Sequence, residues 1–131
     1  MVRAILVSAF LAAVLYGCTR DQASTTASCP GCPAISFTAD IIPIFQANCV
    51  SACHTGPTGS AAGHISLDSA VAYAQITESG TGYVVPGNAN YSLVYSELLA
   101  GNSLHMPVGG QLDPCSIQKI YCWINQGAKD N

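Results

Sequence analysis

The chain has 131 residues and a formal net charge of −3 at pH 7; half of its residues are apolar and only 8% are charged. This length is typical of one small domain. The chain has only four Lys and Arg residues, two near each end, and the lack of a basic patch argues against binding to nucleic acid or to acidic lipid headgroups.

The first residues have the pattern of an export signal. Arg3 precedes an apolar run over residues 4–16, which has the length of a signal core and is too short to span a bilayer. The run ends in Leu15-Tyr16-Gly17-Cys18, which resembles the bacterial lipobox, whose cysteine is lipidated. We therefore expect a lipoprotein-type signal peptide at residues 1–17, a lipid on Cys18, and a place in the bacterial cell envelope, in the periplasm or at the outer membrane. An ordinary secretory signal, cleaved a few residues later, is the alternative.

Residues 18–35 are rich in Ser, Thr, Ala and Pro and have no periodic apolar pattern. We expect a tether here, followed by a single domain over residues 36–129. The domain begins with a predicted helix that Asp40 caps and that has Pro43 in its first turn, where no N–H is needed. Its apolar side consists of Ile41, Ile42, Ile44 and Phe45.

Three further segments repeat the helical spacing i, i+3, i+4, i+7. They are Leu67, Ala70, Val71 and Ala74; Tyr91, Val94, Tyr95 and Leu98; and Ile117, Ile120, Tyr121 and Ile124. We expect Asn90 to cap the second of these helices and Gly101 to end it, while the third begins after Asp113 and ends at Gly127. Residues 83–85 are the one short candidate for a strand. The pattern predicts an all-α domain with long loops.

Seven cysteines in an exported chain require an explanation. Apart from Cys18 and two others discussed below, four remain, an even number that fits two disulfides: Cys29, Cys32, Cys115 and Cys122. On an intact helix, Cys115 and Cys122 would be about 10 Å apart, farther than the ~7 Å that a disulfide allows. We therefore expect Cys29 and Cys32 to bond to the last helix, in an order that the sequence does not give. A local Cys29–Cys32 bond is the alternative.

The predicted first helix runs into the motif Cys49-Val50-Ser51-Ala52-Cys53-His54. Two thiols and an imidazole at the end of an apolar helix are what covalent haem attachment requires, because each sulfur can bond one vinyl carbon while the histidine reaches the iron. The familiar motif has two residues between its cysteines, and this one has three. We expect Cys49 and Cys53 to attach one haem c and His54 to be an axial ligand.

A second axial ligand is expected, and in electron carriers it is usually Met or His. Apart from Met1 the chain has one methionine, Met106, which precedes a proline in a Gly-rich loop between two helices. That loop, residues 101–112, has too few large apolar side chains to pack by itself, so we expect it to lie against another part of the molecule or a haem. Met106 is the expected ligand, and His105 and His64 are its competitors.

Residues 37–128 resemble the c-type cytochrome domains of bacterial exported proteins, including those in planctomycete and Bacteroidetes-type multidomain enzymes. Four patterns occur in the same order: I-x-P-I-F-x-x-x-C at 41–49, P-G-N-x-x-x-S-x-x-Y at 86–95, M-P-x-G-G-x-L at 106–112, and I-x-x-I-x-x-W-I-x-x-G-A at 117–128. The resemblance implies a small cytochrome c-like fold of short helices around one covalent haem, with His54 and Met106 as axial ligands. It also implies that Trp123 packs within the last helix.

These patterns predict a monohaem carrier that moves one electron at a time between extracytoplasmic redox partner proteins and is not an enzyme. No acid, base or nucleophile is convincingly arranged for catalysis, and three of the seven carboxylates, Asp40, Asp68 and Asp113, are interpreted as helix caps. One alternative is a zinc site made by Cys49, Cys53, His54 and His64. Another is a cofactor-free, disulfide-stabilised lipoprotein that binds a partner, with Cys49 paired to Cys53.

Overall fold

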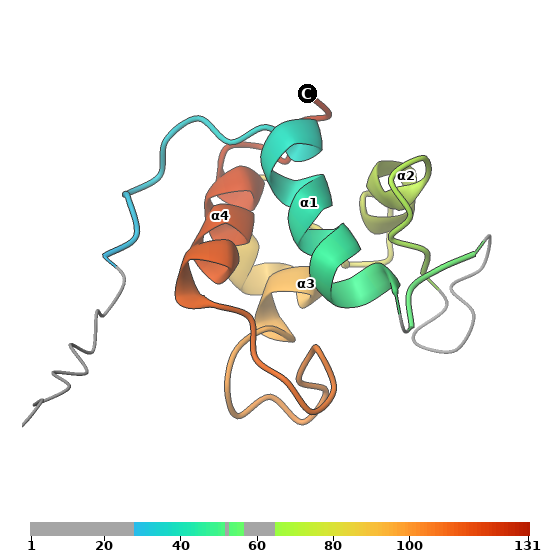
Figure 1. Ribbon diagram of the computed structural model, residues 1–131. Helices are drawn as coiled ribbons and strands as arrows, with labels where there is room; N and C mark the ends of the chain where they lie inside the picture. The colour runs from blue at the N-terminus through green and yellow to red at the C-terminus, as the bar shows by residue number, and fades with distance from the viewer. Residues whose placement is uncertain (1–27, 52, 57–64) are drawn as a thin grey trace, which may run out of the picture.

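The structure is a computed structural model that describes residues 28–51, 53–56 and 65–131 (Figure 1). The expected signal peptide, Cys18 and His64 lie outside these residues. The described residues form helices and loops and contain no strand, so the predicted all-α class is confirmed for them. Among them, no helix has the length and apolar content needed to cross a bilayer.

The N-terminal helix consists of three consecutive pieces, η1 (Phe37–Ile41), α1 (Ile42–Phe45) and η2 (Gln46–Val50). It is followed by α2 (Ala72–Ile76), η3 (Ala89–Tyr91), α3 (Leu93–Ser96) and α4 (Pro114–Asn125). The N-terminal helix and α4 lie side by side, and the short helices α2 and α3 pack around them (Figure 1).

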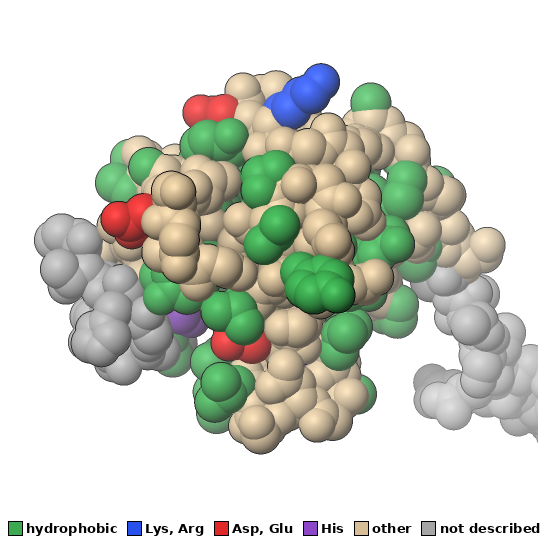
Figure 2. Space-filling view, turned by 180° about the vertical axis from the view of Figure 1, so that it is seen from behind, with side chains coloured by type: hydrophobic (Ala, Val, Ile, Leu, Met, Phe, Trp, Pro, Cys, Tyr) green, Lys and Arg blue, Asp and Glu red, His purple; other side chains and the backbone are tan. Residues whose placement is uncertain are grey.

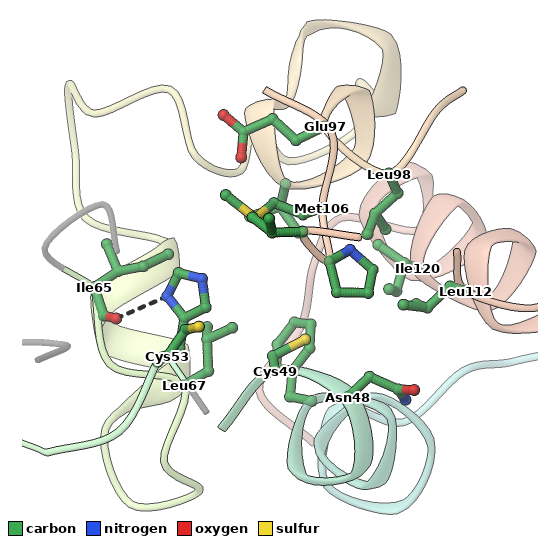
Figure 3. A pocket seen from close by; sticks show the side chains of 15 residues that line it. Asn48, Cys49, Cys53, Ile65, Leu67, Glu97, Leu98, Met106, Leu112 and Ile120 are labelled. Atoms are coloured by element: carbon green, nitrogen blue, oxygen red, sulfur yellow. Dashed lines mark hydrogen bonds between the residues drawn. The ribbon is translucent and has the colours of Figure 1, made fainter. Parts of the chain in front are cut away.

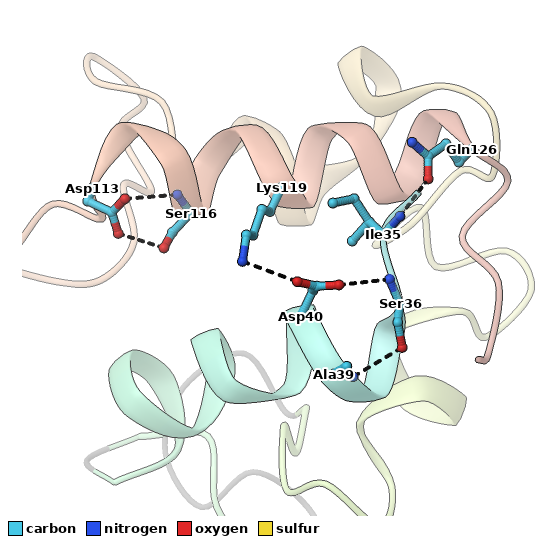
Figure 4. A network of polar contacts seen from close by, with 8 residues as sticks. All are labelled: Ile35, Ser36, Ala39, Asp40, Asp113, Ser116, Lys119 and Gln126. Carbon is cyan, nitrogen blue, oxygen red and sulfur yellow. Dashed lines mark hydrogen bonds and ion pairs between the residues drawn. The ribbon is translucent and has the colours of Figure 1, made fainter. Parts of the chain in front are cut away.

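The N-terminal helix begins at Ser36, four residues before the predicted cap. The Ser36 hydroxyl accepts a hydrogen bond from the Ala39 N–H at 3.1 Å, and the Asp40 carboxylate accepts one from the Ser36 N–H at 3.1 Å (Figure 4). This is a reciprocal capping arrangement: Ser36 is the N-cap, and Asp40, within the first turns of the helix, accepts the hydrogen bond from the backbone N–H of the cap. The prediction that Asp40 is the N-cap is therefore wrong, because its side chain reaches back to the true cap.

Pro43 consequently lies in the interior of a helix, where it cannot donate a hydrogen bond. The turns before it are wide: the Ile41 N–H donates to the Ser36 carbonyl, five residues earlier. Such π-type turns keep the helix continuous where a proline would otherwise break it. The helix therefore continues to Val50 and carries Cys49, which is half-buried, in its last turn.

The last helix, α4, begins and ends as predicted. The Asp113 carboxylate accepts hydrogen bonds from the backbone N–H groups of Cys115 and Ser116, both at 3.0 Å, and from the Ser116 hydroxyl (Figure 4). Gly127, just beyond the helix, has a φ of 99°, a left-handed conformation that glycine adopts without strain. Asp113 thus satisfies two N–H groups that have no partner within the helix.

Replacing Asp113 by alanine should lower the free energy of unfolding by about 1 kcal/mol, the usual effect of removing an N-cap side chain. Hydrogen bonds, above all from the Ser116 hydroxyl, hold the pKa of Asp113 below its ordinary value of 3.8. The stabilisation is therefore complete above this value and is lost as the pH falls through the lowered pKa. Urea unfolding at pH 7 checks the prediction, with Asp113→Asn as the control that keeps a capping oxygen; equal losses in both variants would contradict it.

The apolar faces of the two middle helices differ from the prediction. In α2, Ala72 and Ile76 are buried, whereas Val71 is 37% exposed. The chain turns just before this helix, where the N–H groups of Val71 and Ala72 both donate to the Asp68 carbonyl. That turn shifts the helical phase relative to Leu67, so the spacing Leu67, Ala70, Val71 and Ala74 does not mark one buried side.

Helix α3 begins after Ser92, and Asn90 does not cap it. Its first N–H groups, those of Leu93 and Val94, donate to the carbonyls of Gly82 and Tyr83. Residues 83–85, the candidate strand, are therefore not a strand, and Tyr83 together with the preceding Gly82 supplies acceptors to the start of a helix. As a result Tyr91 is 77% exposed instead of packing with Leu98.

An aromatic cluster forms the core between the N-terminal helix, α2 and α4. The ring of Phe37 lies 5.0 Å from that of Trp123, 5.2 Å from that of Tyr73 and 6.4 Å from that of Phe45. Trp123 is fully buried, and its indole N–H donates to the Lys129 carbonyl at 2.9 Å. The expected packing of Trp123 is therefore present, with its polar group satisfied.

Two disulfides fix the N-terminal arm to α4. Cys29 bonds to Cys115 and Cys32 bonds to Cys122, with Cα–Cα distances of 5.2 and 5.3 Å. The expected bonding of Cys29 and Cys32 to the last helix is confirmed, and the structure shows which cysteine bonds to which. Disulfides of this kind are characteristic of proteins in an oxidising environment outside the cytoplasm.

Candidate functional site

One cavity of about 280 Å³ collects the four side chains that the sequence singles out as haem ligands and attachment points: Cys49, Cys53, His54 and Met106. Its size is close to the lower end of the range of ~300–1,000 Å³ typical of small-molecule sites. The other side chains around it are mostly apolar: Phe45, Asn48, Ile65, Leu67, Val94, Glu97, Leu98, Pro107, Val108, Leu112 and Ile120. In Figure 3, Cys53 and Ile65 lie on one wall, and the side chain of Met106 points into the space from another.

The two thiols come from the end of the N-terminal helix and the turn that follows it. Cys49 belongs to η2, and the turn is closed by a hydrogen bond from the His54 N–H to the Cys49 carbonyl at 3.1 Å. Cys49 and Cys53 are both unpaired, whereas Cys29, Cys32, Cys115 and Cys122 are all in disulfides. Burial raises the pKa of the Cys49 thiol from 9.0 to about 11, so this sulfur is held in its neutral form at pH 7.

In the unmodified protein, Cys49 should react with iodoacetamide at pH 8 about 100-fold more slowly than in the unfolded chain, because only the thiolate is nucleophilic. The reaction is slower in the folded protein because the raised pKa leaves less thiolate at pH 8. The rate of alkylation should increase tenfold per pH unit until about pH 11. Mass spectrometry of the alkylated Cys49 peptide measures it, with the same reaction in urea as the control. Equal rates in folded and unfolded protein would be the contrary result.

The imidazole of His54 is oriented by a backbone carbonyl. Its Nδ1 lies 3.1 Å from the Ile65 oxygen (dashed in Figure 3). Because a carbonyl only accepts, Nδ1 carries the hydrogen, and Nε2 retains a lone pair. The Leu67 N–H donates to the His54 carbonyl at 2.9 Å, and the Gln46 amide donates to the Leu67 carbonyl at 3.1 Å. The His54 ring is therefore fixed through Nδ1, which leaves Nε2 available to bind a metal.

Asp68 ties together the two described segments on either side of residues 57–64. Its carboxylate accepts hydrogen bonds from the Gly56 N–H at 2.8 Å, from the Thr55 hydroxyl at 3.3 Å and from the Ser66 hydroxyl at 3.3 Å. Helix α2 has no side-chain cap. The interpretation of Asp68 as a helix cap is wrong, since it instead supports the turn that follows His54.

Met106 belongs to a loop that is fixed to the end of α3. Its N–H donates to the Glu97 carbonyl at 2.7 Å, and the Gln111 side chain donates to the Leu98 carbonyl at 3.2 Å. The loop therefore does lie against another element, and its anchoring places the thioether on the cavity wall. His105 is engaged elsewhere, with its Nε2 3.0 Å from the Gln111 side-chain oxygen, and it does not line the cavity.

Glu97 is a cavity residue that the sequence analysis missed. Burial raises the pKa of its carboxyl, and the nearby His54 opposes that shift. The missed signal is its position: Val94, Glu97 and Leu98 have the i, i+3, i+4 spacing of one helical face. A carboxylate on an otherwise apolar face could have been recognised as part of the site.

The described residues contain no group of three or more His, Cys, Asp or Glu side chains placed to hold a metal ion. Cys49, Cys53 and His54 thus do not form a ready zinc site among themselves, and His64, the fourth member of that proposed set, lies outside the described residues. No family model, no curated protein and no solved structure matches this chain.

Proposed function

We propose that this chain is a monohaem c-type cytochrome that carries single electrons between extracytoplasmic redox proteins. The observation that supports this most strongly is the convergence in one apolar cavity of two unpaired thiols, an imidazole with a free Nε2, and the thioether of Met106. These are the groups that attach a haem c and ligate its iron. The donor set and the apolar lining therefore fit the cofactor.

Each residue has a defined part in the proposal. Cys49 and Cys53 would hold the haem through their sulfurs, and the His54 imidazole and the Met106 thioether would ligate its iron; all four residues line the cavity. When bound, the haem supplies a one-electron couple between ferric and ferrous iron. The Ile65 carbonyl fixes the tautomer and direction of His54, and a thioether ligand favours the ferrous state over what two histidines would give. The apolar side chains of Leu98, Leu112 and Ile120 exclude water.

The unpaired state of Cys49 and Cys53 favours the cytochrome over a cofactor-free binding module. Four other cysteines of the chain form disulfides, while these two remain free beside a cavity. If His54 and Met106 both ligated the iron, no position on it would remain for a substrate, so the proposal is a carrier and not an enzyme. Lipidation of Cys18 and a tethered position in the bacterial cell envelope belong to the same proposal.

A visible difference spectrum tests the proposed function. The protein is expressed together with haem-attachment machinery, purified, and recorded in reduced and oxidised forms. A sharp α-band that survives extraction with acidified acetone is the expected result, because thioether bonds retain the cofactor. A colourless protein with bound zinc would favour the zinc site, and a colourless metal-free protein would favour the binding module.

A further inference from the structure

Apolar side chains are exposed on the loop that carries Met106 to the cavity. Val108 lines the cavity and is 80% exposed, and Leu104, on the same loop, is 63% exposed. The loop is held by the bonds from Met106 to Glu97 and from Gln111 to Leu98, so these side chains are presented from an anchored segment. Exposed apolar side chains beside a cavity are candidates for contact with a partner when a second property, such as charge, points to the same surface. We call the cavity-lining residues Glu97 and Val108, together with Leu104 of the same loop as Val108, the cavity rim.

The charges around the cavity rim have one sign. From residue 21 to residue 118 the chain contains no Lys or Arg. Carboxylates, in contrast, are found at two parts of the cavity wall: Glu97 lines it, and Asp68 accepts a hydrogen bond from the Gly56 N–H, two residues after His54. Any partner that reaches the cavity rim therefore meets a negative field.

The two basic residues of the described chain are placed away from the rim. The Lys119 ammonium is 3.1 Å from the Asp40 carboxylate of the N-terminal helix (Figure 4). Lys129 follows the end of α4, where its carbonyl accepts from the Trp123 indole. In Figure 2, blue side chains appear only at the upper edge of the face, whereas red side chains also occur lower down among green ones.

We propose that the cavity rim docks a basic redox protein, one that presents an apolar contact face bordered by Lys and Arg. This inference rests on the proposed function and adds the chemistry of the partner. A second copy of the chain would bring Glu97 toward its own equivalent in a symmetric contact, and an anionic membrane surface would also meet like charge. A partner of opposite charge gains both attraction during approach and burial of Leu104 and Val108.

The test uses a lysine-rich cytochrome c of the mitochondrial type as the probe. The reduced holoprotein is mixed with the ferric probe in a stopped-flow instrument; one electron passes to the probe, and no proton or bond is exchanged. The second-order rate constant should fall roughly 10-fold between low and high salt, as electrostatic steering is screened. An acidic blue-copper protein as the second probe should give a rate constant that rises with salt.

Two matched variants localise the docking surface. Leu104→Lys should lower the low-salt rate constant with the basic probe roughly 5-fold and raise it with the acidic probe. Tyr91→Lys makes the same change of charge at a side chain that is 77% exposed and belongs to η3, whose Ala89 N–H donates to the Asn125 side chain at the far end of α4. This control should behave like the unmodified protein. Equal effects of both variants, or none of Leu104→Lys, would overturn the proposal.

Zero-length carbodiimide cross-linking gives a second readout that needs no haem. Glu97 or Asp68 should be joined to lysines of the probe, as peptide mass spectrometry can show. Links confined to other carboxylates such as Glu78, a dimer of the chain formed through the rim, or binding to anionic vesicles in place of the probe would each overturn the proposal. A missing haem spectrum refutes the proposed function separately, since cross-linking still reports on the surface.

Discussion

Removing both disulfides should lower the free energy of unfolding by about 7 kcal/mol, whereas removing either one alone should lower it by only about 3 kcal/mol. Each bridge by itself closes a loop with a sequence separation of 86 or 90 residues. Once one bridge is present, the other closes a loop of only about ten residues, because Cys29 and Cys32 are close in sequence and so are Cys115 and Cys122. The second bridge therefore removes less entropy from the unfolded chain.

The measurement is urea unfolding of three variants: Cys29→Ala/Cys115→Ala, Cys32→Ala/Cys122→Ala, and the variant with all four substitutions. A loss of about 7 kcal/mol would exceed or nearly equal the total stability of many small domains, so the fourfold variant should be largely unfolded at 25 °C. If its stability matched that of the single-bridge variants, the arm would not be anchored to α4 through both pairs.

Replacing Met106 by alanine should leave the haem attached and lower the midpoint potential on the order of 0.2 V, a fraction of the ~0.8 V range that axial ligands set. The thioether stabilises the ferrous state, and its loss opens one axial position. Attachment should persist because Cys49, Cys53 and His54 come from the opposite part of the cavity lining and do not depend on this loop.

The adjacent histidine provides the control for this prediction. His105 is bonded to Gln111 and does not line the cavity, so His105→Ala should leave the potential and the near-infrared sulfur–iron band unchanged. Spectroelectrochemical titration of both variants measures the two quantities. An unaltered potential in Met106→Ala together with a changed one in His105→Ala would assign the distal position to the histidine.

The parts of the fold that follow from local chemistry could be predicted from the sequence. Asp113 and Pro114 define the start of α4, and the rise of this helix alone rules out a bond between Cys115 and Cys122. The beginnings of the N-terminal helix and of α3 were not predicted. The first has two possible capping residues four positions apart, Ser36 and Asp40, and the second takes its acceptors from outside the helix. Asp40 reaches back to Ser36, and the carbonyl of Gly82 serves α3 from a segment earlier in the chain.

The candidate site, too, could be predicted in part: the residues close together in the sequence were found, and the contacts that depend on the fold were not. Cys49, Cys53 and His54 are neighbours in the sequence, so their motif is readable directly. Ile65 could not be identified as the acceptor for His54, because any backbone carbonyl serves and only the fold selects one. Met106 could be proposed by its rarity, but its anchoring to Glu97 depends on how the loop meets α3.

The intact mass of the matured protein tests the central claim most directly. Protein produced with haem-attachment machinery should carry the added mass of one haem, located on the peptide that contains Cys49 and Cys53, and the Cys49→Ala/Cys53→Ala variant should lack it. An unmodified mass, with both thiols still open to alkylation after denaturation, would contradict the assignment of this protein as a c-type cytochrome.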